Sequence, residues 1–187
     1  MSRLKVVIFG TGGHAAVAMD ILVLQKYTVI GFVSDQQKEV GDAIFNRIEC
    51  IGTDDDKKIL TRIKNGTWGY FVAIGSNKIR KKVIDRVFTA TGKRPINAIH
   101  PDVVMSKVFP RIGWGNFINC GVKINIYAAI GNGTIINTSA TVDHECVIGD
   151  YAQICPGVHL GGNVKVEQGA FLGLGAVVIP EVNIGEK

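Results

Sequence analysis

A six-residue repeat constrains the fold of this 187-residue chain more than any other feature. Counting in steps of six from Ile112 to Ile184, all thirteen residues are aliphatic, and the residue four places after each is usually small. This period is neither that of an α-helix nor the two-residue alternation of an ordinary strand. It predicts a chain that turns a corner every six residues, with three flat faces per coil and stacked coils that bury the repeated side chains. Residues 112–187 are therefore expected to form about four and a third coils of a parallel β-helix.

Glycine, asparagine or aspartate often follows the aliphatic residue, as at Gly131, Asn137 and Asp143. These residue types tolerate tight or left-handed backbone conformations. The sequence predicts that the corners of the β-helix use them for that purpose.

The first half of the chain alternates strand and helix patterns. The apolar run Leu4–Phe9, the glycine turn Gly10–His14 and the helical spacing of Ala15–Leu24 indicate a strand, a turn and a helix. Further strands are predicted at 27–33 and 70–74, with a short edge strand at 50–52 and a last strand at 95–99. One helix is predicted to begin with an acidic first turn at 54–56 and to end at about residue 64. A second helix is predicted at 77–91, after the N-cap Ser76. Residues 1–98 are thus expected to form a Rossmann-like α/β domain with a small parallel sheet, and residues 99–187 the β-helix domain.

The charge distribution and the cysteine pattern limit the possible partners and the cellular location of the protein. Residues 1–98 carry 16 basic and 9 acidic side chains, and residues 99–187 carry 5 and 7, so the excess of +5 lies in the first half. Basic residues are not interleaved with aromatic ones, which argues against nucleic acid as a partner. The four cysteines form no CxxC pair, and we find neither a signal-peptide pattern nor an apolar run of about 18 residues. A cytoplasmic protein without a membrane span or a metal site is expected.

The glycine turn satisfies the pattern G-x-G-x-x-A between a strand and a helix, with Asp35 about twenty residues further on. Alone, this pattern indicates a dinucleotide oxidoreductase, but a β-helix stands where a dehydrogenase has its substrate domain. Backbone amides at a helix N-terminus would bind the phosphates of a nucleotide-linked substrate equally well. A second polar turn at Gly75–Arg80 suggests that both turns line one pocket.

The segment Asp143–Cys146 carries the strongest candidate for catalysis. The six-residue register turns Cys146 inward as a packed thiol and leaves His144 and Glu145 near a corner with their side chains outward. A carboxylate beside an imidazole can orient the ring and raise its basicity. The pattern therefore predicts His144 as a general base supported by Glu145.

Four segments in both halves, Gly10–Ala15, Ala73–Arg80, Ile96–Pro101 and Ile136–Gly149, together resemble one family. The chain is similar to the sugar O- and N-acetyltransferases of the sialic acid O-acetyltransferase and UDP-4-amino-sugar N-acetyltransferase group, which have a left-handed β-helix. This resemblance implies acetyl-CoA as the donor, a homotrimer as the working unit, and a place in glycan precursor synthesis. It also implies His144 and Glu145 as catalytic residues, Gln153 and Leu174 as acetyl-CoA contacts, and nucleotide-sugar contacts at Gly12, Gly13, His14, Ser34, Asp35 and Gly75.

Two features depart from that family. Gln153 stands where many members have histidine, although its amide can still donate a hydrogen bond. The repeat stops partway through a coil, so the C-terminal coil that helps to bind CoA is expected to be incomplete. The favoured function is N-acetylation of a nucleotide-linked amino sugar. O-acetylation of sialic acid or a related hydroxyl and a non-catalytic trimeric nucleotide-binding scaffold stay open, and the residues identify neither the sugar nor the nucleotide.

Overall fold

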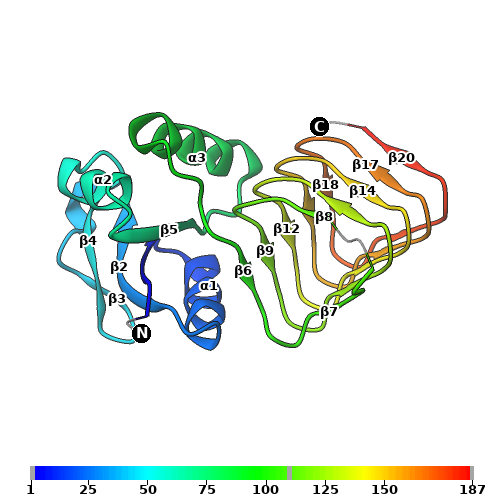
Figure 1. The fold of residues 1–187 in the computed structure, drawn as a ribbon, viewed down its shortest axis with the longest axis horizontal. Helices are drawn as coiled ribbons and strands as arrows, with labels where there is room; N and C mark the ends of the chain where they lie inside the picture. The colour runs from blue at the N-terminus through cyan, green and yellow to red at the C-terminus, as the bar shows by residue number, and fades with distance from the viewer. Residues whose placement is uncertain (1–2, 109–110, 186–187) are drawn as a thin grey trace. The chain divides into compact units, whose positions relative to one another are not determined.

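The computed structural model describes residues 3–108 and 111–185, and the chain divides into two compact units, Met1–Ile96 and Asn97–Lys187. The first unit is an α/β domain (Figure 1). Its sheet has the strand order β3-β4-β2-β1-β5, in which β4, β2, β1 and β5 are parallel. The elements in chain order are β1 (Lys5–Phe9), α1 (Gly13–Leu24), β2 (Thr28–Ser34), the 3-10 turn η1 (Gln37–Glu39), β3 (Ala43–Phe45), β4 (Ile48–Thr53), α2 (Lys57–Lys64), β5 (Trp68–Val72) and α3 (Asn77–Thr91).

The edge of this sheet differs from the sequence prediction. The strand expected at the edge, 50–52, is part of β4 and pairs on both sides, because β3 adds an antiparallel edge strand. Asn46 and Arg47 form the tight hairpin turn between β3 and β4, both with positive φ. This turn contains no glycine, which is the usual sequence signal for such a hairpin, and β3 was therefore missed.

Capping interactions fix the helix ends. The prediction that Asp56 lies inside the first turn of α2 is wrong, because it is the N-cap and accepts hydrogen bonds from the backbone of Lys58 and Ile59. Its side chain is short enough to satisfy those free N–H groups from just outside the helix. Helix α3 has the predicted bounds, with Ser76 as N-cap and Gly92 in the left-handed conformation at its end.

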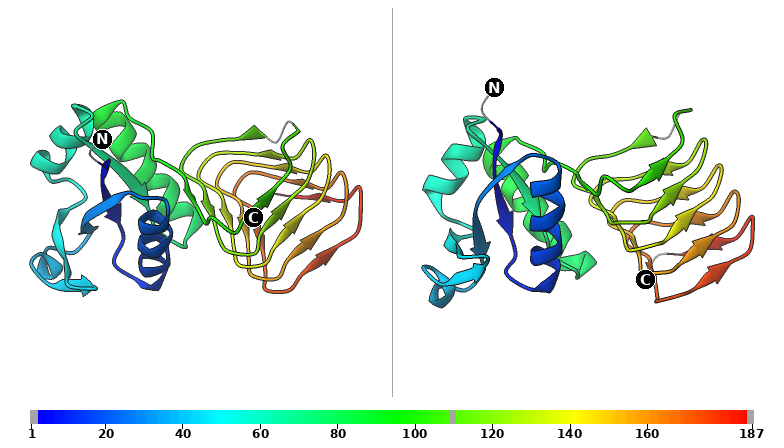
Figure 2. Two further views of the ribbon diagram at one scale, coloured as in Figure 1. Left: turned by 60° about the horizontal axis from the view of Figure 1, so that its bottom comes forward. Right: turned by 90° about the horizontal axis from the view of Figure 1, so that it is seen from below.

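The second unit is a left-handed parallel β-helix, in which residues 97–108 and 111–185 form fifteen two-residue strands in three five-stranded sheets (Figures 1 and 2). The first sheet contains β6 (Ala98–Ile99), β9 (Phe117–Ile118), β12 (Ile135–Ile136), β15 (Gln153–Ile154) and β18 (Phe171–Leu172). The second contains β7 (Val104–Met105), β10 (Lys123–Ile124), β13 (Thr141–Val142), β16 (His159–Leu160) and β19 (Val177–Val178). The third contains β8 (Arg111–Ile112), β11 (Ala129–Ile130), β14 (Val147–Ile148), β17 (Lys165–Val166) and β20 (Asn183–Ile184).

The β-helix begins earlier than predicted. Strand β6 was expected to close the α/β sheet, but it pairs with β9 and forms part of the first coil, so the unit has five coils rather than four and a third. The inward-facing residues of the first coil are Ile99, Met105 and Ile112. The step from Ile99 to Met105 is six residues, whereas the step from Met105 to Ile112 is seven. One extra residue between β7 and β8 breaks the period, which hides the first coil in the sequence.

The repeated aliphatic residues form the core, as predicted. From Ile118 to Leu172 each of them is at most 5% exposed, and the small residues that face them, such as Ala140 and Cys146, are fully buried. Stacking places the coils at the spacing of neighbouring β-strands, so each inward side chain packs on its counterparts above and below.

The sequence predicted left-handed corner residues directly after each aliphatic residue, and this prediction is wrong. Every sixth residue from Gly115 to Glu181 has positive φ, and it lies three places after the aliphatic one. The position after the aliphatic residue has other roles. Asn125 and Asp143 accept hydrogen bonds there from the next backbone N–H and bond to each other between coils, while Gly149 allows close backbone approach.

Candidate active site

A cleft of about 560 Å³ lies in the α/β unit where β1, β2 and β5 end. In an open parallel sheet, ligands usually bind at the carboxyl ends of the strands, at the point where successive strands begin to add to the other side of the sheet. Here that point is at β1, which lies between β2 and β5. The structure brings all six predicted substrate contacts to this cleft: Gly12, Gly13, His14, Ser34, Asp35 and Gly75.

The glycines of the first turn have different roles. Gly10 has a φ of 119°, and a Cβ there would lie 2.6 Å from the carbonyl oxygen of Ala73, so β1 and β5 can approach only with glycine at this position. Gly12 and Gly13 face open space, and Gly12 caps α1 without a side-chain hydrogen bond. The N-terminus of α1 therefore presents bare backbone amides to the cleft, an arrangement suited to phosphate.

Arg80 stabilises the second turn from beneath. Its guanidinium is 1% exposed and donates to the carbonyl oxygens of Ile74 and Gly75, both at 3.0 Å, and to Oδ1 of Asn77 at 2.8 Å. The run of basic residues in 78–86 predicts a solvated helix face that includes Arg80, and this prediction is wrong for Arg80 because the carbonyl groups of the turn hold its side chain inward. Burial and the charge of Arg80 lower the pKa of His14 to about 4, which keeps that imidazole neutral at physiological pH.

The low pKa of His14 predicts a loss of stability in acid. An unfolded His14 binds a proton near pH 6.5 and the folded one only near pH 4, so between these values the unfolded state holds the extra proton and acidification favours it. The loss attributable to His14 should reach at most about 3 kcal/mol near pH 4. Urea unfolding between pH 7 and pH 4.5 should show a steeper decline for the wild type than for His14→Gln, and equal slopes would contradict this assignment.

The second candidate site is the corner between β13 and β14, where His144 and Glu145 lie. Their side chains are 51% and 61% exposed, and Nδ1 of His144 lies 3.1 Å from Oε2 of Glu145. Glu145 has a φ of 61°, and its counterparts in the stacked corners, Tyr127, Asn163 and Glu181, have φ values of 60°, 57° and 64°. If this carboxylate oxygen accepts from Nδ1–H, Nε2 carries the lone pair that a general base needs.

Two neighbours hold the His144 corner in place. Asp143 accepts a hydrogen bond from the backbone of His144 at 2.8 Å and another from Asn125, and these bonds lower its pKa. The His144 ring lies over Gly162 of the next coil, where a Cβ would come within 2.5 Å of ring atoms. Gly162 is a feature of the site that the sequence did not reveal, because it follows His144 by one full coil of eighteen residues.

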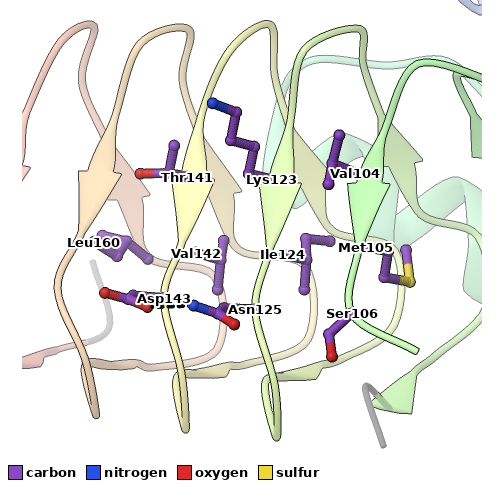
Figure 3. Close-up of a pocket in the computed structure, with 10 residues that line it drawn as sticks. All are labelled: Val104, Met105, Ser106, Lys123, Ile124, Asn125, Thr141, Val142, Asp143 and Leu160. Carbon is purple, nitrogen blue, oxygen red and sulfur yellow. Dashed lines mark hydrogen bonds between the residues drawn. The ribbon is translucent and has the colours of Figure 1, made fainter. Parts of the chain in front are cut away.

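A cleft of about 530 Å³ runs along the second sheet of the β-helix and reaches this corner (Figure 3). Val104, Lys123 and Thr141 line one side, and Ser106, Asn125 and Asp143 line the other. Asp143, the residue before His144, lines this cleft, whereas His144 and Glu145 are not among its lining residues.

The two predicted acetyl-CoA contacts lie elsewhere on the coil. Gln153 is on the first sheet, and its Oε1 is buried without a hydrogen-bond partner among the described residues. Leu174 follows that sheet at the next corner and is 77% exposed.

Cys146 is buried beneath the His144 corner, and burial raises the pKa of its thiol, as expected for a packed cysteine. Among residues 3–108 and 111–185 no cluster of potential metal ligands occurs, and no helix there is long and apolar enough to cross a membrane.

Comparisons with known proteins agree with this architecture. The PglD N-terminal domain family matches residues 5–87. The crystal structure of a histidine-to-alanine variant of GDP-perosamine N-acetyltransferase from Caulobacter crescentus, in complex with CoA and GDP-perosamine, is 37% identical, with a TM-score of 0.86 over 97% of this chain and 83% of that one. The acetyltransferase domain of PglB from Neisseria gonorrhoeae is 25% identical, with a TM-score of 0.76 over 95% of this chain and 92% of that one.

A curated relative, GDP-perosamine N-acetyltransferase of Escherichia coli O157:H7, is 37% identical over 110 residues, which are 58% of this chain and 49% of the relative. The match thus spans about half the length of that protein. The six-residue repeat and its left-handed β-helix place the chain in the class of hexapeptide-repeat acyltransferases. Within this class the chain belongs to the family of sugar N-acetyltransferases that includes GDP-perosamine N-acetyltransferase.

Proposed function

We propose that this protein transfers the acetyl group of acetyl-CoA to the amino group of a nucleotide-linked amino sugar. The observation that carries this proposal is the His144–Glu145 pair, an exposed imidazole whose Nδ1 lies 3.1 Å from the Glu145 carboxylate. The relatives support a GDP-linked sugar, because structures 30% and 37% identical to this chain contain CoA and GDP-perosamine.

In the proposed reaction the neutral amine attacks the thioester carbonyl, so a C–N bond forms and the C–S bond breaks. Nε2 of His144 takes the proton that the amine loses, and the carboxylate of Glu145 stabilises the imidazolium. The proton can then pass to the departing CoA thiolate. Backbone N–H groups near the corner would stabilise the oxyanion of the tetrahedral intermediate.

The nucleotide belongs in the α/β cleft. The bare amides of Gly12 and Gly13 suit its phosphates, and the six residues named from the sequence surround it. His14 is neutral there, so it lines the cleft without adding charge.

A homotrimer would complete the acetyl-CoA site. His144 lies at the corner between the second and third sheets, whereas Gln153 lies on the first sheet, on the opposite side of the coil. Each face spans six residues, or roughly 20 Å of extended chain, so the two side chains of one subunit cannot both reach one acetyl group. A neighbouring copy would supply Gln153 and Leu174. Co-expressed His144→Ala and Gln153→Ala subunits should then recover activity that neither variant has alone. No recovery, or a monomer by sedimentation, would contradict the shared site.

Gly162 offers a test of the His144 geometry. We expect Gly162→Ala to lower kcat by about tenfold to a hundredfold, because the new methyl group must push the ring aside and small displacements of a catalytic group are costly. Thermal stability should hardly change, since the obstacle is the end of an exposed side chain. Gly173→Ala, at an open position in the same unit, is the matched control. A Gly162→Ala variant with unchanged kcat would show that the ring position is unimportant.

The substrate class can be tested by CoA-thiol release. Acetyl-CoA is supplied with a GDP-linked 4-amino sugar, a UDP-linked 4-amino sugar or free sialic acid in parallel. Release with amino-sugar nucleotides but not with sialic acid supports the proposal, and faster release with the GDP-linked than with the UDP-linked sugar supports the ranking of GDP over UDP. Release with sialic acid alone would instead establish O-acetylation, and nucleotide binding without any release would favour a non-catalytic scaffold.

A further inference from the structure

Three polar side chains form one wall at the mouth of the α/β cleft. Thr11 comes from the glycine turn and Ser34 from the end of β2, and both line the cleft. Behind them, on η1, Oε2 of Glu39 accepts a hydrogen bond from Oγ1 of Thr11 at 2.9 Å and from Oγ of Ser34 at 2.6 Å. The spacing of the glycine pattern indicates Asp35 as the relevant acid, but the structure shows Glu39 as the carboxylate bonded to the turn.

The hydrogen bonds to Glu39 determine the polarity of this wall. Its two hydroxyl donors hold the pKa of Glu39 below the ordinary value, so the side chain is ionised at neutral pH. An ionised carboxylate only accepts, and therefore both hydroxyl protons must point toward it. Ser34 also accepts from the backbone N–H of Gln36 at 3.0 Å. Toward the cleft, Thr11 and Ser34 can present only oxygen lone pairs.

This polarity distinguishes one part of a nucleotide from another. Phosphate oxygens are acceptors, so they gain nothing from a wall of acceptors, whereas sugar hydroxyls can donate to it. The amides of Gly12 and Gly13, at the N-terminus of α1, have the opposite polarity and suit phosphate. The two surfaces thus match the ribose and the phosphates that are joined in any ribonucleotide.

We propose that Glu39 is a positioning residue that sets Thr11 and Ser34 to accept hydrogen bonds from the ribose hydroxyls of the bound nucleotide. This inference rests on the proposed nucleotide-sugar function and adds a specificity to it. The site selects ribonucleotides over nucleotides that lack the ribose hydroxyls.

Calorimetry with GDP and 2′,3′-dideoxy-GDP tests this inference, because the two probes differ only in the hydroxyl groups. We expect the wild type to bind GDP about tenfold more tightly, the ratio that corresponds to one or two net hydrogen bonds. In Glu39→Ala nothing holds the two hydroxyls in one orientation, so their hydrogen bonds to the ribose lose their preorganised geometry and the ratio should fall to within about twofold. Thr11→Val, which removes one acceptor with little change in shape, should also lower the ratio.

Glu49→Ala is the matched control, because it removes an exposed carboxylate from the same unit and should leave the ratio unchanged. If Glu39 had a merely structural role, Glu39→Ala would weaken the binding of both probes equally and preserve the ratio of their affinities. That result would overturn the proposal. A wild type that binds both probes equally would overturn it as well. A wild type that binds neither GDP nor UDP would instead refute the nucleotide-sugar function on which the inference depends.

Discussion

Replacing His144 with alanine is expected to lower kcat for acetyl transfer by a factor of about 10² to 10⁴, the usual contribution of a general base. The imidazole is exposed at a corner, and its ring lies on a glycine rather than in the core. Its loss should therefore leave the free energy of unfolding almost unchanged. Steady-state kinetics with acetyl-CoA and the amino-sugar nucleotide would measure the effect.

His159→Ala is the control for this substitution, because His159 is an exposed histidine on the neighbouring strand β16. Its ring bonds Thr141 at 2.9 Å and takes no part in the proposed chemistry. We expect this variant to keep most of the wild-type rate. A His144→Ala protein with more than half of the wild-type rate would remove His144 from the mechanism.

Replacing Gly149 with alanine is expected to destabilise the β-helix by about 3 kcal/mol, the upper part of the usual range for overpacking. A Cβ at this position would lie 2.5 Å from the backbone nitrogen of Gln168 and 2.8 Å from the carbonyl carbon of Glu167. Both atoms belong to the backbone of the next coil, so no side-chain rotation can relieve the clash. Urea or thermal unfolding of the purified protein would measure the loss.

Gly173→Ala separates this steric effect from the general cost or benefit of replacing a glycine. Gly173 also follows a core aliphatic residue, but a Cβ there meets no atom within 4 Å. We expect its stability to stay close to that of the wild type. Equal losses in the two variants would show that the spacing of the coils does not explain the glycine at position 149.

Features with a fixed period or a local cap could be predicted from the sequence. The six-residue repeat placed every inward residue from Ile112 to Ile184, and Ser76 and Gly92 marked both ends of α3. The glycine turn located the cleft of the α/β unit, because the residues that form this part of its lining are adjacent in the sequence. The register also indicated correctly that His144 is exposed and Cys146 buried.

Features that depend on contacts distant in sequence could not be predicted. Glu39 meets Thr11 across 28 residues, and Gly162 meets His144 across one coil. The burial of Arg80 depends on carbonyl groups that only the folded turn brings together. The first coil was hidden because a single inserted residue is enough to interrupt a strict period.

The central claim is that acetyl is transferred to an amine, and the chemistry of the product tests it most directly. The protein would be incubated with labelled acetyl-CoA and GDP-perosamine, and the isolated sugar nucleotide treated with mild alkali. We predict a labelled product that keeps its acetyl group, because an amide survives conditions that hydrolyse an ester. Loss of the label in alkali, or no labelled product at all, would contradict the proposed N-acetyltransferase function.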